Sequence, residues 1–312
     1  MSKMRFALNG LLVVVLGLLC SAAAQAQACR TWVSANGNDA DPCSRTAPCK
    51  TFAGALSKTA EGGEIDVLDP GGYGTVNINK SITIDGGTGS GWASVLASGT
   101  NGIIVNVTTN PSTAVVILRN ISINGTRRGS CSPGLNGIRY LAGSKLMVEN
   151  CTIFGFSQKG IDVNLTATGT LVVQDSTIED NNDGIVMTNN AGTMKADITG
   201  TKMHANGNSG LNLLSGTASL SNSVVSATNN VAVVAQGGAS INATNNVFAN
   251  NSIGLQTVGV SAALRISNND ILNNTTGLSN AGTTTSTQNN KFLGNTTDVS
   301  GNPITNCPTC VK

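Results

Sequence analysis

The sequence predicts an all-β chain that winds into a single-stranded parallel β-helix, a solenoid in which each short repeat forms one coil. Three observations predict this fold: a phrase that recurs every 21–30 residues, apolar runs of strand length inside each repeat, and an asparagine-rich corner before one of those runs. The recurrence is visible in DSTIEDNNDGIVM from Asp175, NNVFANNSIGLQT from Asn245 and NNDILNNTTGLSN from Asn268.

One apolar position recurs in every repeat, at Ile123, Ile153, Ile178, Met203, Val225, Phe248, Ile271 and Phe292. The apolar runs are three to five residues long and alternate between apolar and polar side chains, which is typical of short strands. The period is too short for TPR, ankyrin or HEAT repeats, and the leucine framework and helical return segment of leucine-rich repeats are missing. The pattern therefore predicts three short strands per coil.

A second column lies three residues earlier, at Asn120, Asn150, Asp175, Gly200, Asn222, Asn245, Asn268 and Asn289. A sharp corner between strands needs a residue in the left-handed region, where Asn, Asp and Gly are the tolerated types. Coils stack about 4.8 Å apart, so side-chain amides in this column can also hydrogen bond from coil to coil.

A third column opens the next strand, usually as Gly followed by an aliphatic residue. We assign to it Ile138, Ile161, Ile185, Leu211, Ala232, Leu255, Leu278 and Val299. Alternation then predicts the outward residues of this strand, which are Asp66, Ile104, Arg139, Asp162, Val186, Asn212, Val233, Gln256 and Ser279.

Residues 1–28 form a predicted secretory signal peptide. Lys3 and Arg5 precede the apolar run LLVVVLGLLC, and A-x-A sites end at Ala26 and Ala28. The apolar run is too short to span a bilayer, and no second run follows. We therefore expect a secreted or periplasmic protein that has no membrane span once the leader is cleaved near Ala26 or Ala28.

The mature chain divides into a cap region over 29–62, a β-helix over 63–306 and a tail over 307–312. A solenoid end needs a cap. The stretch KTFAGALSKTA, residues 50–60, places Phe52, Ala55 and Leu56 at helical spacing and predicts a helical cap beneath the first coil.

Charge gives no indication of a nucleic-acid partner. The leader removes two of the 18 basic residues and none of the 16 acidic ones, which leaves 16 of each sign in the mature chain. The slightly basic balance of the whole chain therefore comes from the leader, and we expect no nucleic-acid binding.

Seven cysteines follow the leader, at Cys29, Cys43, Cys49, Cys131, Cys151, Cys307 and Cys310. Export favours disulfides, which we expect within the first three and between Cys307 and Cys310 in the tail. The odd number leaves at least one thiol unpaired. No second close pair completes a zinc-binding set, so we expect no metal site.

The entry segment RTWVSANGNDADPCSRTAPCKTFAGAL from Arg30, followed by GGEIDVLDPGGYG and KSITIDG, carries a family resemblance. With these segments and the repeats, the mature chain resembles the right-handed parallel β-helix repeat proteins of the pectin-lyase-like superfamily, in particular a group of exported bacterial members. The resemblance implies a right-handed coil. It leaves activity open, because relatives include pectate lyases, polygalacturonases, epimerases, phage tailspikes and adhesins.

The resemblance implies that a substrate would lie along the outward face of the strand that follows the inserted loops. Lyase chemistry there needs several carboxylates to hold calcium and an Arg or Lys to remove a proton, and inverting glycosidases need two carboxylates. This face offers Asp162 beside Arg139 and no other adjacent acid. We therefore expect no catalytic residues and no cofactor.

Candidate ligand-binding residues gather between 92 and 162: Trp92, Arg127, Arg128, Arg139, Lys159 and Asp162. We place the loops at 86–101 and 124–136 at equivalent corners, which would bring Trp92 and the two loop arginines to one rim. An aromatic platform beside guanidinium groups suits an acidic sugar chain. The competing interpretation is that Trp92 packs its loop and the arginines only keep the surface soluble.

The leading hypothesis is therefore an exported, non-catalytic β-helix that binds an acidic polysaccharide or another cell-envelope glycan. The alternative is a polysaccharide lyase that acts on acidic glycans through Arg139, Lys159 and Asp162. We expect the single histidine, His204, to be a solvated loop residue, and the run Glu179 to Asp183 to be a solvated turn.

Overall fold

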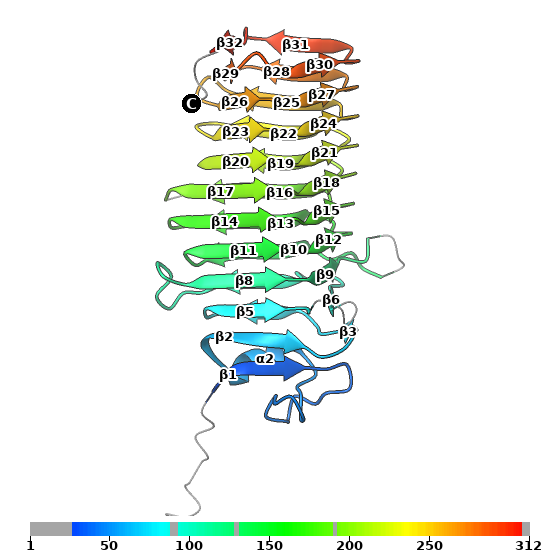
Figure 1. Cartoon of the computed structure of the whole chain (residues 1–312), viewed down its shortest axis with the longest axis vertical. Helices are drawn as coiled ribbons and strands as arrows, with labels where there is room; N and C mark the ends of the chain where they lie inside the picture. The colour runs from blue at the N-terminus through cyan, green and yellow to red at the C-terminus, as the bar shows by residue number, and fades with distance from the viewer. Residues whose placement is uncertain (1–26, 88–92, 128–130, 190–191, 308–312) are drawn as a thin grey trace, which may run out of the picture.

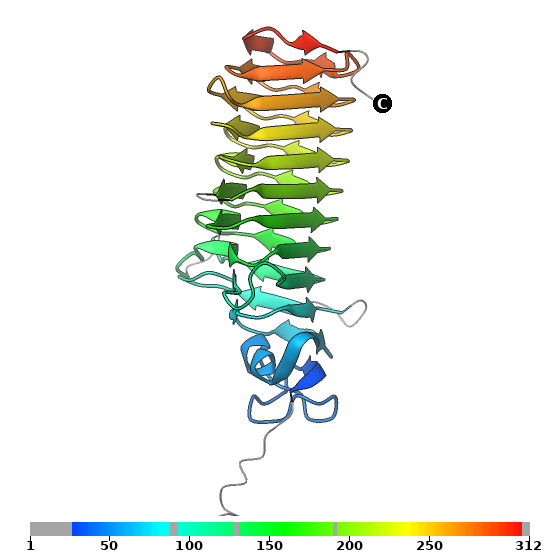
Figure 2. The same ribbon diagram turned by 90° about the vertical axis from the view of Figure 1, so that its left-hand side faces the viewer.

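A computed structural model describes residues 27–87, 93–127, 131–189 and 192–307. Within these ranges the chain forms three parallel sheets of 12, 10 and 10 strands that share one stack of coils. Figures 1 and 2 show the coils piled along one long axis, with the N-terminal segment at one end and the last strands at the other. The predicted all-β parallel solenoid is confirmed.

Sheet A has 12 strands: β1 (Ala28–Val33), β2 (Thr59–Val67), β5 (Ile82–Asp85), β8 (Val115–Arg119), β11 (Lys145–Glu149), β14 (Gly169–Gln174), β17 (Met194–Thr199), β20 (Thr217–Ser221), β23 (Ser240–Thr244), β26 (Ala263–Ser267), β29 (Thr283–Ser286) and β32 (Thr305–Asn306). Sheet B has ten: β3 (Gly71–Gly72), β6 (Ala93–Leu96), β9 (Ile121–Asn124), β12 (Thr152–Phe154), β15 (Thr177–Glu179), β18 (Lys202–His204), β21 (Val224–Ser226), β24 (Val247–Ala249), β27 (Asp270–Leu272) and β30 (Lys291–Leu293).

Sheet C contains the strands that follow the inserted loops. They are β4 (Val76–Ile78), β7 (Ile103–Asn106), β10 (Asn136–Ala142), β13 (Lys159–Leu165), β16 (Asp183–Asn189), β19 (Ser209–Leu213), β22 (Val231–Gln236), β25 (Ile253–Val258), β28 (Thr276–Asn280) and β31 (Thr297–Gly301). Each complete coil passes through sheets A, B and C in that order.

The helix α2 (Phe52–Lys58) lies at the N-terminal end of the stack, as predicted for the cap (Figure 1). It begins after Thr51, whose hydroxyl accepts a hydrogen bond from the Gly54 amide at 2.9 Å. Phe52, Ala55 and Leu56 are buried, and the Phe52 ring lies 5.2 Å from that of Tyr73. The helix therefore closes the apolar interior at this end.

The repeated apolar column lines the interior. Its members on β9 to β27 are fully buried, and Phe292 on β30 is partly buried. Every pairing between successive coils in the three sheets is parallel and mostly in register, for example Ile153 with Ile178 and Ile178 with Met203. Stacking of like residues gives one continuous core along the axis.

The predicted corner column lies between sheets A and B. Its first seven members have positive φ values of 48–59°. Amides bond along the column, as when Asn268 Nδ2 donates to Asn245 Oδ1 at 2.7 Å. The prediction was wrong at Asn289, because Gln288 adopts the left-handed conformation in the last coil, where more residues separate β29 from β30.

A ladder of side-chain amides, which the sequence analysis missed, lies one residue after the corner in the last coils, where earlier coils have Cys151, Ser176, Thr201 and Ser223. Asn246 donates to Asn269 and Asn269 donates to Asn290, each on the following coil, and Asn246 N lies 3.0 Å from Asn269 Oδ1. A second buried ladder between sheets B and C contains Asn181 with Asn206, and Asn251 with Asn274 and Asn295. These ladders satisfy turn amides that stacking would otherwise leave buried without partners.

Two register assignments in the third column were wrong. Asp66 lies on β2 of sheet A, so Asn77 is the residue that pairs with Ile104 on sheet C. Val233, expected to face outward, pairs with Leu211 and Leu255 and is fully buried, while Val234 takes the outward place. Ala232 fills the place of the preceding glycine, where a Cβ on Gly184 would lie 2.4 Å from the Gly210 carbonyl oxygen.

The two long loops lie at equivalent corners only in part. Strand β6 of sheet B divides the first one. Residues 97–102, between β6 and β7, lie at the corner between sheets B and C, as does the loop between β9 and β10, and the Gly99 amide donates to the Ser132 carbonyl at 3.0 Å. The sequence analysis missed β6 because ASVL is a short run next to glycine and serine. The corner expected to begin at residue 86 therefore begins after Leu96.

The expected disulfide among the first three cysteines joins Cys43 to Cys49. Cys307 is also in a disulfide, and its expected partner Cys310 lies outside the described residues. Cys29, Cys131 and Cys151 have free thiols. Within the described ranges, the chain contains no helix of the length and hydropathy needed to cross a bilayer.

Candidate functional site

Three of the predicted ligand-binding residues lie together on the outward face of sheet C. Arg139 is on β10, and Lys159 and Asp162 are on the next strand, β13. The register pairs Arg139 directly with Asp162, because the two strands are parallel neighbours. We call Arg139, Lys159 and Asp162 the sheet C cluster.

The carboxylate of Asp162 lies between the two cations. Its Oδ1 is 2.6 Å from Lys159 Nζ, and its Oδ2 is 3.2 Å from Arg139 Nε. The Asp162 side chain is 5% exposed, whereas those of Lys159 and Arg139 are 30% and 38% exposed. The cluster therefore covers its single acid and presents two cations to solvent, with one formal positive charge in excess.

Because Asp162 is buried, its ionised carboxylate would destabilise the fold without Lys159 and Arg139 beside it. A desolvated carboxylate is stabilised only by close opposite charge and hydrogen bonds, and removal of one partner of a buried pair is strongly destabilising. Asp162 thus fixes the positions of the Lys159 ammonium and the Arg139 guanidinium. A preorganised guanidinium loses less conformational entropy when it binds an anion.

Strand β10 also carries buried polar atoms without hydrogen-bond partners. Three such side-chain atoms occur among the described residues, and two of them are Asn136 Oδ1 and Arg139 Nε on this strand. Arg139 Nε is close enough to Asp162 for an ion pair but lacks hydrogen-bond geometry. Native proteins leave few buried polar groups unsatisfied, and the Arg139 atom lies 3.2 Å from the Asp162 carboxylate.

Polar side chains continue along the same face beyond the cluster. Asn164, Asn212, Gln236 and Gln256 are half-buried, and Gln236 Nε2 donates to Asn212 Oδ1 at 2.8 Å. Val186 and Val234 lie between them and are nearly covered. This face therefore combines a cationic cluster at one end with amide groups that can donate and accept hydrogen bonds.

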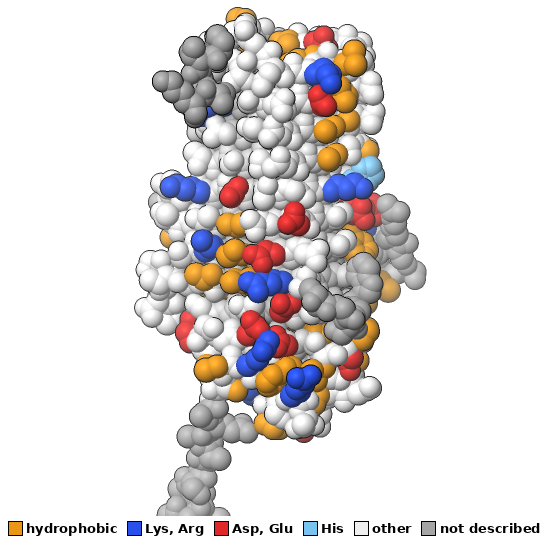
Figure 3. All heavy atoms as spheres, viewed as in Figure 1, with side chains coloured by type: hydrophobic (Ala, Val, Ile, Leu, Met, Phe, Trp, Pro, Cys, Tyr) orange, Lys and Arg blue, Asp and Glu red, His pale blue; other side chains and the backbone are white. Residues whose placement is uncertain are grey.

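Two arginines of the first coils of sheet A, Arg30 and Arg119, are paired with acids. Arg30 bonds Glu64 and Asp66 at 2.9 and 2.5 Å, and Arg119 bonds Glu149 at 2.8 Å. Figure 3 shows this face, with red and blue side chains interleaved over the first coils and few charges above them. These two arginines therefore add no comparable excess of positive charge.

The remaining predicted residues do not join the sheet C cluster. Trp92 and Arg128 lie outside the described residues. Arg127 is exposed on the loop after β9, where its Nη1 donates to the backbone carbonyl of Asp180 at 3.5 Å. It lines a cleft over sheet B, whereas Arg139 lies on sheet C.

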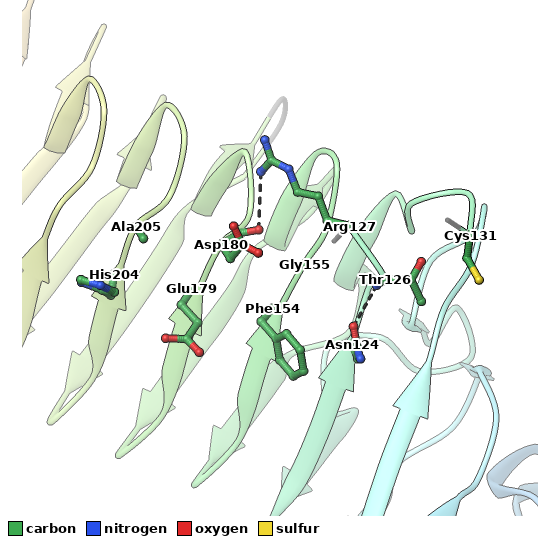
Figure 4. A pocket seen from close by; sticks show the side chains of 10 residues that line it. All are labelled: Asn124, Thr126, Arg127, Cys131, Phe154, Gly155, Glu179, Asp180, His204 and Ala205. Atoms are coloured by element: carbon green, nitrogen blue, oxygen red, sulfur yellow. Dashed lines mark hydrogen bonds between the residues drawn. The ribbon is translucent and has the colours of Figure 1, made fainter. Parts of the chain in front are cut away.

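This sheet B cleft, of about 650 Å³, was missed by the sequence analysis. Its lining residues are Asn124, Thr126, Arg127, Cys131, Phe154, Gly155, Glu179, Asp180, His204 and Ala205. Figure 4 shows that Asn124, Phe154, Glu179 and His204 come from successive strands, while Thr126, Arg127 and Cys131 come from the loop. In a strand, the residue after a buried one faces outward, so the residues that follow the apolar column, Asn124, Phe154, Glu179 and His204, could have been identified from the sequence.

Two expectations about this region were wrong. His204 is the last residue of β18 rather than a loop residue, and its Nδ1 lies 3.0 Å from Ser226 Oγ. The stretch from Glu179 to Asp183 is not a fully solvated turn, since Asn181 and Asp183 are buried. Among the described residues, no group of three or more His, Cys, Asp or Glu side chains converges as a metal site would.

Comparisons with known proteins agree with this architecture. Residues 66–219 match the family model described as "Right handed beta helix region". No curated protein sequence matches the chain.

Several solved structures share the fold. Pectate lyase Pel9A is 17% identical, with 86% of this chain and 80% of that chain covered and a TM-score of 0.58. The enzymatically active domain of tailspike protein 2 from bacteriophage CBA120 is 12% identical, with 81% and 43% covered and a TM-score of 0.57. The GH136 lacto-N-biosidase from Eubacterium ramulus is 8% identical, with 89% and 67% covered and a TM-score of 0.58. At these identities the likeness shows the fold alone.

Proposed function

We propose that this parallel β-helix, whose residues 66–219 match the right-handed β-helix family model and whose fold pectate lyase Pel9A shares, binds an acidic polysaccharide or another cell-envelope glycan along the outward face of sheet C. The sheet C cluster holds carboxylates of the glycan, and the amide groups beyond it bond hydroxyls. The protein acts outside the cytoplasm, secreted or periplasmic, after removal of residues 1–28, and it binds without catalysis.

The observation that carries this proposal is the arrangement around Asp162. Within the described part of the chain, the one hydrogen bond or ion pair of the Arg139 side chain is its ion pair with Asp162 through Nε, so its two terminal nitrogens are available to a ligand. A guanidinium presents these donors in a planar fork that matches a carboxylate. Lys159 adds a second cation beside it.

The structural neighbours support a carbohydrate ligand. By their names, a pectate lyase and a lacto-N-biosidase act on carbohydrates, and both share this fold over more than four fifths of the present chain. Neither likeness distinguishes binding from catalysis. The local charge on sheet C favours acidic glycans over neutral ones.

The second candidate is a polysaccharide lyase in which Arg139 removes the proton next to a uronate carboxylate. The similarity to a pectate lyase favours it. Against it, Asp162 is the one acid paired with Arg139 among the described residues, and both cations already contact it. The next acid, Asp183 on β16, pairs in register with Lys159 and bonds Asn208 and Ser209. Arginine is effectively always protonated, which suits anion binding better than proton abstraction.

Binding of polygalacturonate and alginate to the mature protein, measured by calorimetry, tests the proposal. We expect Arg139→Ala to weaken binding by about tenfold to a hundredfold, because a hydrogen bond to a charged group contributes about 1.5–3 kcal/mol. Arg265→Ala, which removes an exposed cation from sheet A, is the matched control and should leave affinity within about twofold. Higher salt should weaken binding of the wild-type protein.

A parallel assay follows the absorbance of unsaturated products from the same polymers. Binding without product formation supports the proposal, whereas product formation that Arg139→Ala abolishes supports the lyase. Binding that the Arg139 and Arg265 variants lose equally would contradict both assignments of the site.

A further inference from the structure

The sheet B cleft lies on a different sheet from the cluster proposed above. Asn124, Phe154, Glu179 and His204 are paired in register across β9, β12, β15 and β18. Strands in a sheet lie about 4.8 Å apart, so the row extends about 14 Å along the coil axis. The loop residues Thr126, Arg127 and Cys131 form its wall.

The four side chains of this row differ in chemistry: an amide, an aromatic ring, a carboxylate and an imidazole. Phe154 is half-buried and presents an aromatic ring from β12, between Asn124 on one side and Glu179 on the other (Figure 4). Ser226, one coil beyond, contacts His204 Nδ1 at 3.0 Å and thereby holds the imidazole ring, so that Nε2 remains for a ligand. An aromatic face flanked by donors and acceptors matches a sugar ring, which has an apolar face and hydroxyls at its edge.

The charge of the cleft differs from that of sheet C. Among the described residues that line it, the charged side chains are those of Arg127, Glu179 and Asp180, and Asp180 has a partner of its own. Glu179 makes no hydrogen bond or ion pair with other described residues. An unpaired carboxylate repels a uronate and accepts hydrogen bonds from hydroxyls.

From these features we infer that the sheet B cleft is a second binding site, for a short neutral oligosaccharide whose ring stacks on Phe154 and whose hydroxyls bond Glu179, His204 and Asn124. The volume of about 650 Å³ lies within the usual range for ligand pockets. This inference is independent of acidic-glycan binding on sheet C. The extended face of a β-helix can present two sites to the same or to different polymers.

Calorimetric titration of the mature protein with cellotriose, maltotriose and triacetylchitotriose tests the inference. We expect at least one of the three to bind, and Phe154→Ala to weaken that binding by about tenfold, whereas Phe154→Tyr retains the ring and stays within about threefold. Glu179→Gln should weaken it by about fivefold, because a neutral amide replaces a charged acceptor.

The matched control is Leu272→Ala, which truncates the residue at the same position on β27, three coils beyond His204, and should leave affinity unchanged. Arg139→Ala should also leave trisaccharide binding intact. Absence of binding by all three sugars, or equal affinity of the wild-type protein and Phe154→Ala, overturns the inference. Loss of binding in Arg139→Ala also overturns it, because the two sites would then be one.

Discussion

The side-chain amide of Asn150 donates a hydrogen bond to Oδ1 of Asn120, 2.7 Å away, although 30 residues separate the two in the sequence. Asn120 Nδ2 in turn donates to Asp85 Oδ1 at 2.8 Å. Corner residues of successive coils are therefore linked through their side chains as well as through the strands. This linkage explains why polar corner residues recur in the repeats, although a hydrophobic core alone would not require them.

The buried ladder should contribute more to stability than exposed asparagines. Asn269 is buried, its Oδ1 accepts from the Asn246 amide at 3.0 Å, and its Nδ2 donates to the Ala243 carbonyl at 2.8 Å. Asn269→Ala leaves these groups buried without partners, at about 1–3 kcal/mol each. We expect urea denaturation to show a loss of about 3 kcal/mol. Asn229→Ala, at an exposed asparagine, should change stability by less than about 0.5 kcal/mol.

The left-handed corners should reject a β-branched residue. Asn268 has φ of 52° and donates to Asn245. Valine at this φ costs about 1–2 kcal/mol, whereas glycine adopts it freely. Asn268→Val should therefore melt at a lower temperature than Asn268→Gly, although both lose the same side-chain hydrogen bond. Equal melting of the two variants would show that the corner conformation is not under this constraint.

The cap should lose stability in acid. Desolvation raises the pKa of Asp39, but hydrogen bonds from Thr51 and Lys50 outweigh this effect and hold the pKa below its ordinary value. The stability gained is present above the unfolded-state pKa of about 4 and is lost as pH falls through the folded-state value. The gap in melting temperature between wild type and Asp39→Asn should therefore narrow below about pH 4. A gap that is constant with pH would rule out this role for Asp39.

Thiol reactivity should follow burial. Cys29 and Cys131 are exposed, whereas Cys151 is buried and desolvation raises its pKa to about 12. The thiolate is the reactive form, so iodoacetamide should modify Cys29 and Cys131 in the folded protein and Cys151 only after unfolding. Peptide mapping by mass spectrometry measures this, and modification of Cys151 at the same rate as Cys131 would contradict the buried position.

Most of the solenoid could be predicted from the sequence because like residues stack on like residues. The column from Ile123 to Phe292 and the first seven corner residues required only counting. The error at Val233 arose because Ala232 stands where other coils have glycine, so the apparent pattern shifted by one residue. Strand pairing, which places Val233 inside, depends on the neighbouring coils and is not visible in one repeat.

The candidate sites were predictable to different degrees. The contact of Arg139 with Asp162 followed from outward alternation on neighbouring coils, and the structure confirms that they are paired. The sheet B cleft was missed because the sequence analysis did not follow the outward column containing Phe154 and His204. The wall formed by Arg127 could not have been found this way, because the conformation of an inserted loop is not fixed by the repeat.

The central claim of the proposed function is that a uronate carboxylate binds beside Arg139 on sheet C. A crystal structure of the mature protein soaked with trigalacturonate measures that position directly. The account predicts a uronate carboxylate within hydrogen-bond distance of both terminal nitrogens of Arg139, with Lys159 Nζ beside it. A uronate bound away from Arg139, or no bound sugar on sheet C at saturating concentration, would contradict it.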